Sequence, residues 1–408
     1  MKNSAASHPS FKSGRKIWLK VHLYLGLFAG ALLVLISLTG SLIVFGGQID
    51  TWLNVELMRV DRPSENMPVK ALSVILKAAE SVLPETGMIR EVKFPHHPDA
   101  AFSILYHIPP SPDSYQIFVN PYTAEILGQR LWGSFDWCCS WHGPLMAMIY
   151  RFHDSFWLGE IGAMVTGSIG GLMLISMISG IILWWPRSGK LKAALAVKPK
   201  SSSERLTYDL HKVFGIYPAI VLLMLLFTGA YLSFHGSFPK QVNALIGFLS
   251  SITTVPDFSN HKSHIGQDTL NIDKVMNIAN GVIPDGNVEF ILMNNSGNGV
   301  LKVIKSGAND HLQAICRRMV AIDHYSGEVL YTNYSNKPTA GDIFNAWQLS
   351  LHSGEAFGLF GRVVVFIIGI VPLVLYVTGV LRWLQKLKVK RLIAEKSLPR
   401  SFGLGNKP

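Results

Sequence analysis

Four histidines occupy matched positions near the ends of long apolar segments. His22 begins one apolar run, and His211 has the same place in a second run 189 residues later. His153 and His352 are separated by 199 residues and precede two further runs. Ionisable residues near a bilayer core are rare and usually functional. Two imidazoles that face each other in a helix bundle can fill both axial positions of a b-type haem. The pattern therefore predicts two bis-histidine haem sites.

The apolar segments predict four membrane-spanning helices, each near or above the ~18–20 apolar residues that cross a bilayer. The expected spans are Val21–Phe45, Phe156–Trp185, Val213–Phe234 and Phe357–Leu381. A helix over the first span rises about 36 Å at ~1.5 Å per residue, so its ends lie near opposite faces of the membrane. We expect His22 to pair with His211 in one layer, and His153 to pair with His352 in the other.

Small residues follow two of these histidines. Gly26 lies four residues after His22, and Gly215 lies four residues after His211. Residues four apart share a helix face, so both glycines are expected to leave room for a flat macrocycle beside its ligand. The same small residues also suit close helix packing. Spacing alone does not separate these two roles.

Other histidines are weaker candidates. His142 precedes the second span and His235 ends the third, so each is an alternative ligand for the outer layer. His261 and His264 have a His-x-x-His spacing, but no third metal ligand lies nearby in the sequence. Structural or solvated roles are expected for the remaining histidines, His8, His96, His97, His107, His311 and His324.

The composition indicates an integral membrane protein. Hydrophobic residues make up 49% of the 408 residues, charged residues only 15%, and the mean hydropathy is positive. The first apolar run is far longer than the ~7–15 residues of a signal-peptide core, so we expect it to remain as a helix.

The net charge of +11 is concentrated at one end of the spans. Lys and Arg cluster in residues 1–20, 186–212 and 382–408. This is the positive-inside pattern of inner-membrane proteins, so both termini and the middle loop are predicted to be cytoplasmic. The basic residues are expected to meet lipid headgroups, and no nucleic-acid partner is predicted.

The chain contains the same unit twice: a span, an outer module and a second span. Two spans return the chain to its starting side, so the copies are expected to be related by a pseudo-two-fold axis along the membrane normal. The predicted fold is a membrane α-helical protein with a four-helix transmembrane bundle and two periplasmic α+β modules. Its expected segments are a basic N-terminus (1–20), a span (21–46), a module (47–150), a span (151–186), a basic loop (187–209), a span (210–235), a module (236–350), a span (351–384) and a basic tail (385–408).

Each outer module shows the same order of elements. Helices are predicted over Val69–Val82 and Ile272–Val282, and alternating strands near Ile89–Phe94 and Val288–Met293. A strand–turn–strand pattern follows in both copies, at Val119–Leu127 and Ile322–Leu330.

Several reaction classes have no support. The chain lacks a glycine-rich nucleotide-binding fingerprint and a P-loop, so electrons must come from quinol or from a cytoplasmic reductase. No Ser/His/Asp or His-Glu-x-x-His arrangement indicates hydrolysis. Cys138, Cys139 and Cys316 are too few for a disulfide framework, and burial is the favoured role of the adjacent pair.

The repeated motifs resemble the PepSY-associated transmembrane family over about residues 15–385. The resemblance is carried by His22 through Thr39-Gly40, by Phe152–Glu160, by His211 through Thr228-Gly229, and by Leu351–Glu355 through Thr378-Gly379. The outer modules resemble PepSY domains, with Asp323-x-x-Ser-Gly-Glu328 matching the family's turn. The first copy departs from that turn by carrying Ala124 in place of glycine.

Within this family, the motifs look most like those of inner-membrane ferric-siderophore reductases. The resemblance implies a protein with two b haems that carries electrons across the inner membrane to ferric iron held by a siderophore in the periplasm. The aromatic run Trp132, Phe135, Trp137 and Trp141 is either a docking surface for the chelate or an interfacial belt, and the belt is favoured.

Two other classes of function compete with the reductase. A carrier for a siderophore or peptide could use the interface between parallel repeats. A non-catalytic membrane anchor could regulate a partner through its outer modules. Neither needs haem, and neither accounts for four matched histidines.

Overall fold

The structure is a computed structural model. It describes residues 10–61, 67–134, 142–186, 189–237, 256, 258, 261, 268–293, 299–306, 318–334 and 340–397. The chain forms two compact units. Unit 1 comprises Met1–Leu38, Ile169–Phe227 and Ile367–Pro408, and unit 2 comprises Thr39–Ser168 and Thr228–Phe366.

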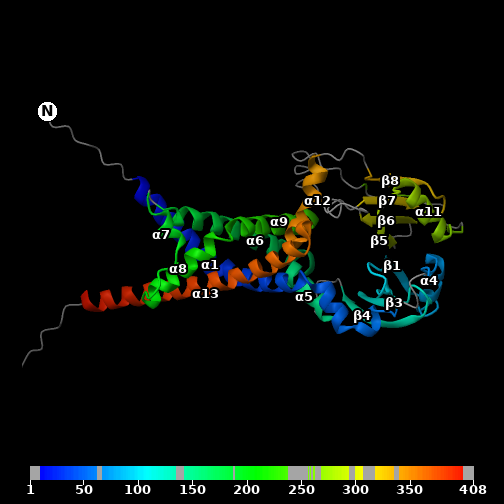
Figure 1. Cartoon of the computed structure of the whole chain (residues 1–408), viewed down its shortest axis with the longest axis horizontal. Helices are drawn as coiled ribbons and strands as arrows, with labels where there is room; N and C mark the ends of the chain where they lie inside the picture. The colour runs from blue at the N-terminus through cyan, green and yellow to red at the C-terminus, as the bar shows by residue number, and fades with distance from the viewer. Residues whose placement is uncertain are drawn as a thin grey trace, which may run out of the picture. The chain divides into compact units, whose positions relative to one another are not determined.

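Within the described residues, three helices are long and apolar enough to cross a membrane: α1 (Ser10–Ile43), α6 (Gly159–Trp184) and α13 (Gly358–Ser397) (Figure 1). Lipid cannot hydrogen-bond to the backbone, and a helix pairs its own N–H and C=O groups, so a long apolar segment crosses a bilayer as a helix. The predicted long apolar helices are therefore confirmed. α13 continues to Ser397, well past the end of the predicted span at 384.

The third span is bent. α8 (Ser203–Ile216) and α9 (Ala219–Ser237) meet at 62° and give a fourth span if the pair is counted as one. Pro218 lies at the break. Proline lacks the amide hydrogen and its ring clashes with the preceding turn, so a helix bends or ends there. The first copy carries Ala29 at the equivalent position, and α1 runs unbroken through it.

Short helices precede two of the spans. α5 (Leu145–Ser155) carries His153, and α12 (Ala340–Ser353) carries His352. The expected boundaries at 151 and 351 fall inside these helices, so both histidines lie on separate helices ahead of the spans. The corner after α5 has left-handed backbone at Phe156 and Trp157, and the corner after α12 contains the 3-10 helix η2 (Glu355–Phe357).

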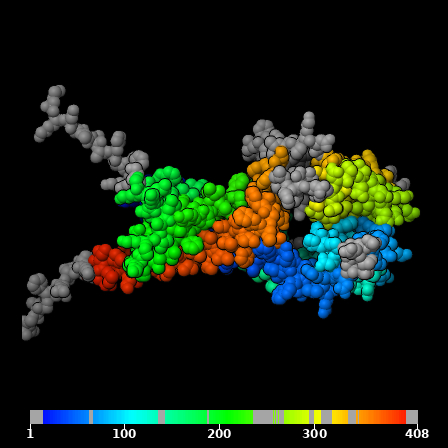
Figure 2. Space-filling view, viewed as in Figure 1, coloured from blue at the N-terminus to red at the C-terminus, as the bar shows by residue number. Residues whose placement is uncertain are grey.

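The two segments expected to form one α+β module each contribute four strands to a single antiparallel sheet. Its strand order is β4-β3-β2-β1-β5-β6-β7-β8. The strands are β1 (Met88–Lys93), β2 (Phe102–His107), β3 (Asp113–Val119), β4 (Ile126–Ser134), β5 (Asn287–Met293), β6 (Val300–Ser306), β7 (Arg318–Asp323) and β8 (Val329–Thr332). β1 joins β5 through the pairs Glu91–Leu292, Val92–Ile291 and Lys93–Phe290. In Figure 2 the half formed by β1–β4 and the half formed by β5–β8 lie side by side.

Helices α4 (Leu72–Glu80) and α11 (Ile272–Val282) pack on one face of this sheet and share its core. The central side chains Ile75, Val92, Val275 and Ile291 are fully buried. Burial of each such side chain contributes about 1.5–3 kcal/mol. The remaining short helices are α2 (Gly46–Leu53), α3 (Val55–Met58) and α7 (Leu191–Leu195).

Matching turns join β3 to β4 and β7 to β8. The side chain of Asn120 accepts hydrogen bonds from the amides of Tyr122 and Thr123, and Asp323 does the same in the second copy. Gly327 has φ +77° in its turn, and Ala124 has φ +62° at the equivalent place. A left-handed backbone costs a residue with a Cβ roughly 1–2 kcal/mol, so the first turn carries strain that the second avoids.

Candidate functional site

The first pair of histidines comes from α1 and α8 in unit 1. The ring centroids of His22 and His211 lie 6.1 Å apart with an interplanar angle of 80°. His22 Nδ1 lies 2.9 Å from the carbonyl oxygen of Ser176 and 3.2 Å from Ser179 Oγ. An Nδ1–H that donates to a carbonyl leaves Nε2 unprotonated, and Nε2 is then the atom that can bind a metal.

The same arrangement holds His211. Its Nδ1 lies 3.1 Å from the carbonyl oxygen of Leu375 and 3.0 Å from Thr378 Oγ1, both on α13. The Thr378 hydroxyl also bonds to its own helix at Val374 O. Because the carbonyl can only accept, it selects the tautomer that carries the proton on Nδ1.

The second pair comes from α5 and α12 in unit 2. The ring centroids of His153 and His352 are also 6.1 Å apart, with an interplanar angle of 46°. His153 Nδ1 lies 3.4 Å from Thr39 Oγ1 on α1. His352 Nδ1 lies 2.9 Å from Thr228 Oγ1 on α9. The two pairs are thus built alike, as the repeat predicts.

A glycine follows each hydroxyl residue and lies against the same imidazole. A Cβ added to Gly40 would be 2.7 Å from Cε1 of His153, and one added to Gly229 would be 2.9 Å from Cε1 of His352. The corresponding distances are 3.0 Å from Gly180 to His22 and 3.4 Å from Gly379 to His211. The four dipeptides are Thr39-Gly40, Ser179-Gly180, Thr228-Gly229 and Thr378-Gly379. We call them the hydroxyl–glycine supports.

Sequence reasoning used three of these dipeptides and Gly180 as repeat markers but gave them no role. The signal was their recurrence at the repeat offsets. What was missing was the partner of each one, because a support and its histidine lie more than 100 residues apart in the chain.

The spacing of the rings fits an axially ligated metal. With metal–imidazole bonds of about 2.0–2.1 Å and a nitrogen about 1.1 Å from its ring centre, two axial imidazoles have centroids about 6.3 Å apart. Both observed separations are 6.1 Å. Among the described residues, no group of three or more His, Cys, Asp or Glu could hold a bare ion. Two imidazoles match a metal whose other ligands come from a macrocycle, so the donor set fits haem.

Gly26 and Gly215 have space beside them. Nothing lies within 4 Å of a Cβ added to Gly26, and one added to Gly215 would be 3.8 Å from Leu375 Cδ2. The positions are compatible with a flat group next to His22 and His211. Their assignment as haem-packing residues stays a prediction.

Of the two alternative ligand candidates for the outer layer, the structure describes His142 but not the side chain of His235. The carbonyl oxygen of His142 accepts a hydrogen bond of 3.0 Å from Nη1 of Arg151 in α5. His235 belongs to α9, but its side chain is outside the described residues. His264, Cys138, Cys139, Cys316 and the aromatic residues Phe135, Trp137 and Trp141 also lie outside them.

Two histidines of the sheet region have structural partners. His261 Nε2 lies 2.7 Å from a carboxylate oxygen of Asp323. His324 Nε2 lies 3.0 Å from the carbonyl oxygen of Leu270, and burial lowers the pKa of His324. A neutral imidazole bonded to a backbone carbonyl stabilises the turn and has no need of a metal.

Arg151 ties the helix of His153 to the sheet, which the sequence did not reveal. Its guanidinium is buried and donates to the carbonyl oxygen of Trp132 on β4 at 2.7 Å as well as to His142. Gly133 beside it has φ +108°, and a Cβ there would lie 2.5 Å from Arg151 Nη1. Arg151 therefore fixes α5 two residues before His153.

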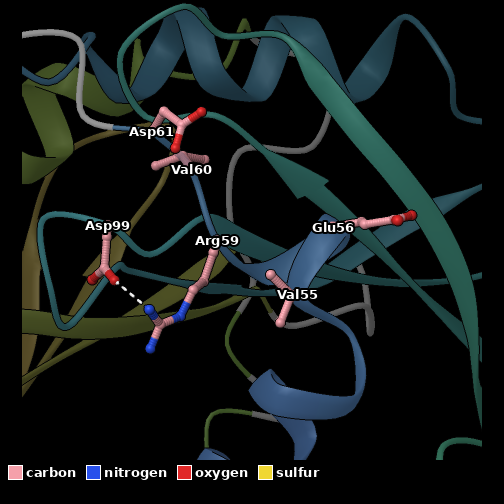
Figure 3. A pocket seen from close by; sticks show the side chains of 6 residues that line it. All are labelled: Val55, Glu56, Arg59, Val60, Asp61 and Asp99. Carbon is pink, nitrogen blue, oxygen red and sulfur yellow. Dashed lines mark ion pairs between the residues drawn. The ribbon is translucent and has the colours of Figure 1, made fainter.

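A shallow pocket lies elsewhere in unit 2. Figure 3 shows its lining residues Val55, Glu56, Arg59, Val60, Asp61 and Asp99. Arg59 and Asp99 form an ion pair of 3.2 Å, and both side chains are about half exposed. None of the four paired histidines lines this pocket.

The comparison with protein families gives one match, to the family described as the PepSY-associated TM region, over residues 19–386. No curated protein matches the sequence. The matched segment covers nearly the whole chain and includes all four paired histidines and their supports. This protein is therefore an integral membrane protein that belongs to the PepSY-associated TM region family.

Proposed function

We propose that this protein is a haem-containing oxidoreductase of the bacterial inner membrane. One b-type haem is held between His22 and His211, and a second between His153 and His352. Electrons enter from quinol or a cytoplasmic reductase and reach ferric iron bound to a siderophore in the periplasm. The protein is then a ferric-chelate reductase.

The observation that carries this proposal is the pair of matched imidazole pairs. Each pair has a ring separation of 6.1 Å, close to the value for two axial ligands of one iron. Each imidazole has a hydroxyl group at Nδ1. Such a partner orients a metal-binding histidine and raises its basicity.

When bound, each haem supplies a one-electron carrier, whose potential the axial ligands and burial adjust. The supports give each Nδ1 a hydrogen-bond partner and orient the ring, and backbone carbonyls select the tautomer of His22 and His211. The glycines keep the space at each Cε1 clear.

The substrate class follows from the chemistry of iron. Siderophores hold ferric iron through oxygen donors, and the softer ferrous ion binds such ligands less strongly. One electron from the donor reduces one ferric ion, so a two-electron quinol serves two ferric ions and releases two protons. Reduction weakens the chelate without breaking a covalent bond.

The test is an absorption spectrum of the purified protein, oxidised and dithionite-reduced, with a haem count per chain. We expect two low-spin b haems that ferric siderophores reoxidise. A colourless protein from cells with ample haem would contradict the proposal. The carrier and the anchor would then be favoured, because neither needs iron porphyrin.

Single histidine variants assign the two sites. His153→Ala or His352→Ala should remove one haem and abolish chelate reduction. His22→Ala or His211→Ala should leave an outer haem that the cytoplasmic donor cannot reduce. His107→Ala is the control, because its imidazole accepts a hydrogen bond from Arg90 in the sheet and should leave both haems in place. Two haems in a quadruple variant of the paired histidines would disprove the ligand assignment.

A further inference from the structure

Three cations surround one tyrosine next to the first histidine pair. Tyr208 lies on α8, three residues before His211. The guanidinium carbons of Arg205 and Arg382 lie 5.6 and 5.5 Å from the centre of its ring, and Lys212 Nζ lies 5.9 Å from it. Cations at this distance are attracted to the ring face. We call these four residues the Tyr208 cluster.

A single carboxylate partly balances this charge. Asp209 is fully buried and pairs with Arg205 at 3.0 Å and with Lys212 at 2.9 Å. Its second oxygen also accepts from the backbone amide of Lys198. Three cations and one carboxylate leave a net charge of +2 in the cluster.

The cations differ in their availability. Lys212 Nζ donates to Asp209 and to the carbonyl oxygens of Ala193 and Ala196, which uses all three of its hydrogens. Arg205 bonds to Asp209 through Nε only, and its side chain is about half exposed. Arg382 has no ion pair within the part of the chain that the structure describes. The terminal nitrogens of both arginines can therefore bind an anion.

The cluster is placed one helical turn from the ligands. Arg382 follows Thr378 by four residues on α13, and Thr378 Oγ1 is the partner of His211 Nδ1. Residues four apart lie on the same helix face. Tyr208 and Arg382 thus continue the faces of α8 and α13 that hold His211, on the side of the basic segments.

We propose that Arg382 and Arg205, positioned on Tyr208, bind the two propionate carboxylates of the haem held by His22 and His211. This inference rests on the proposed function. Two guanidinium groups match two carboxylates in charge, and the planar fork of arginine suits carboxylate binding. Nearby cations stabilise the less positive, reduced iron and so raise its potential.

Tyr208 and Arg382 belong to the second copy alone, whereas the first copy carries Lys16 at the position that matches Arg205. Leu19 and Leu183 occupy the positions in the first copy that match Tyr208 and Arg382. The histidine pair is nearly symmetric, but its carboxylate-binding residues are not. If this haem is bound, Arg205 on α8 and Arg382 on α13 would hold its propionates.

The test is a redox titration of the full-length protein with both haems bound. Arg382→Gln should lower the midpoint potential of the His22–His211 haem by the equivalent of at least a tenfold change in its reduced-to-oxidised ratio, or 59 mV for one electron. The outer haem is the internal reference and should not move. Lys390→Gln removes an exposed charge from the same helix two turns further on and should leave both potentials unchanged. Arg382→Lys should restore most of the shift.

A second measurement separates a direct contact from a change in packing. Replacing haem by its dimethyl ester removes the propionate charges, so Arg382→Gln should weaken binding of haem but have little effect on binding of the ester. Equal weakening of haem and ester binding would overturn the inference. So would loss of this haem from both Arg382→Gln and Arg382→Lys, which would indicate a packing role.

Other outcomes are equally decisive. An unchanged potential together with less copurifying anionic phospholipid would assign the cluster to lipid headgroups and overturn the inference. A wild-type protein without haem would overturn the proposed function as well. If the protein contains two haems and Arg382→Gln changes neither midpoint potential, only this inference would be overturned.

Discussion

At the scale of single residues, a hydroxyl group and a glycine hydrogen act together on every paired histidine. The hydroxyl holds Nδ1, and the neighbouring glycine lets the ring approach the helix. A serine or threonine alone would give Nδ1 a hydrogen-bond partner, but a larger residue after it would push the ring away. The dipeptide is therefore the smallest unit that both orients an imidazole and admits it.

The first prediction concerns the hydroxyl. Thr378→Val keeps the side-chain shape but removes the partner of His211 Nδ1, leaving only Leu375 O. Loss of such a partner weakens metal binding by about 10–100-fold, and we expect the lower end because the carbonyl remains. The measurement is the rate and extent of haem transfer to a competing apoprotein. Thr207→Val is the matched control, since that hydroxyl bonds only within α8. If Thr378→Val and Thr207→Val retained haem equally well, the hydroxyl of Thr378 would have no role in orienting His211.

At the scale of elements, the corners before the second and fourth spans determine where His153 and His352 lie. A Cβ on Gly162 would lie within bonding distance of the Ser155 carbonyl oxygen, and one on Gly361 would be 2.2 Å from the Gly354 oxygen. These glycines match at the repeat offset of 199. Each corner closes only because its helix presents no side chain at that point.

The second prediction tests this corner. Gly361→Ala should force α12 away from α13 and displace His352, at a cost of about 1–3 kcal/mol for an overpacked contact. We expect the outer haem to be lost or high-spin and the His22–His211 haem to stay. Gly171→Ala is the control, because a Cβ there meets nothing within 4 Å. Absorption spectra and haem counts of the two variants give the answer, and equal outer-haem content would show that the corner tolerates a side chain.

The bend in the third span is another property of an element. Pro218 separates α8, which carries His211, from α9, which carries Thr228 and Gly229. The first copy has no break between His22 and Thr39, since both lie on α1. The two copies therefore position equivalent histidines through different helix geometry, and a local proline is the cause.

At the scale of the whole molecule, the duplication is used in two ways. Each histidine is held by a support from its own copy, whereas each pair is formed between copies. The sheet is also formed between copies, because four strands from each copy join through β1 and β5. Neither copy alone completes a histidine pair or the sheet.

The third prediction concerns the contact between α4 and α11, the helices of the two copies that pack on that sheet. Asp273 of α11 accepts hydrogen bonds from the backbone amide of Ser73, at 3.2 Å, and from its hydroxyl on α4. Asp273→Ala should lower the free energy of unfolding of the sheet region by about 1–3 kcal/mol, because hydrogen bonds to a charged group are lost. Denaturant unfolding of the full chain, followed by the fluorescence of its tryptophans, measures the change.

A double-mutant cycle isolates this contact. Ser73→Ala and Asp273→Ala should be clearly non-additive, as expected for residues in direct contact. Ser81→Ala, whose hydroxyl bonds only within its own chain segment to Ala78 O, should add independently to Asp273→Ala. Additive effects of Ser73→Ala and Asp273→Ala would mean that the copies are joined elsewhere.

Much of this protein follows from its sequence. Hydrophobic run length predicts the spans because a bilayer accepts only long apolar helices. Repeat offsets predict which histidines are equivalent, and the helix over Ile272–Val282 has the predicted bounds. These are local or periodic properties, which do not depend on how distant segments meet.

Only the tertiary structure decided the rest. Periodicity cannot say that β1 pairs with β5, because strand pairing depends on partners some 200 residues away. It cannot match Thr39 with His153 or Gly180 with His22, since those contacts arise when whole helices pack. Nor can it gather Arg205 and Arg382 on Tyr208. The sequence determined which residues are available in each copy, and packing between helices decided which of them act on the same imidazole.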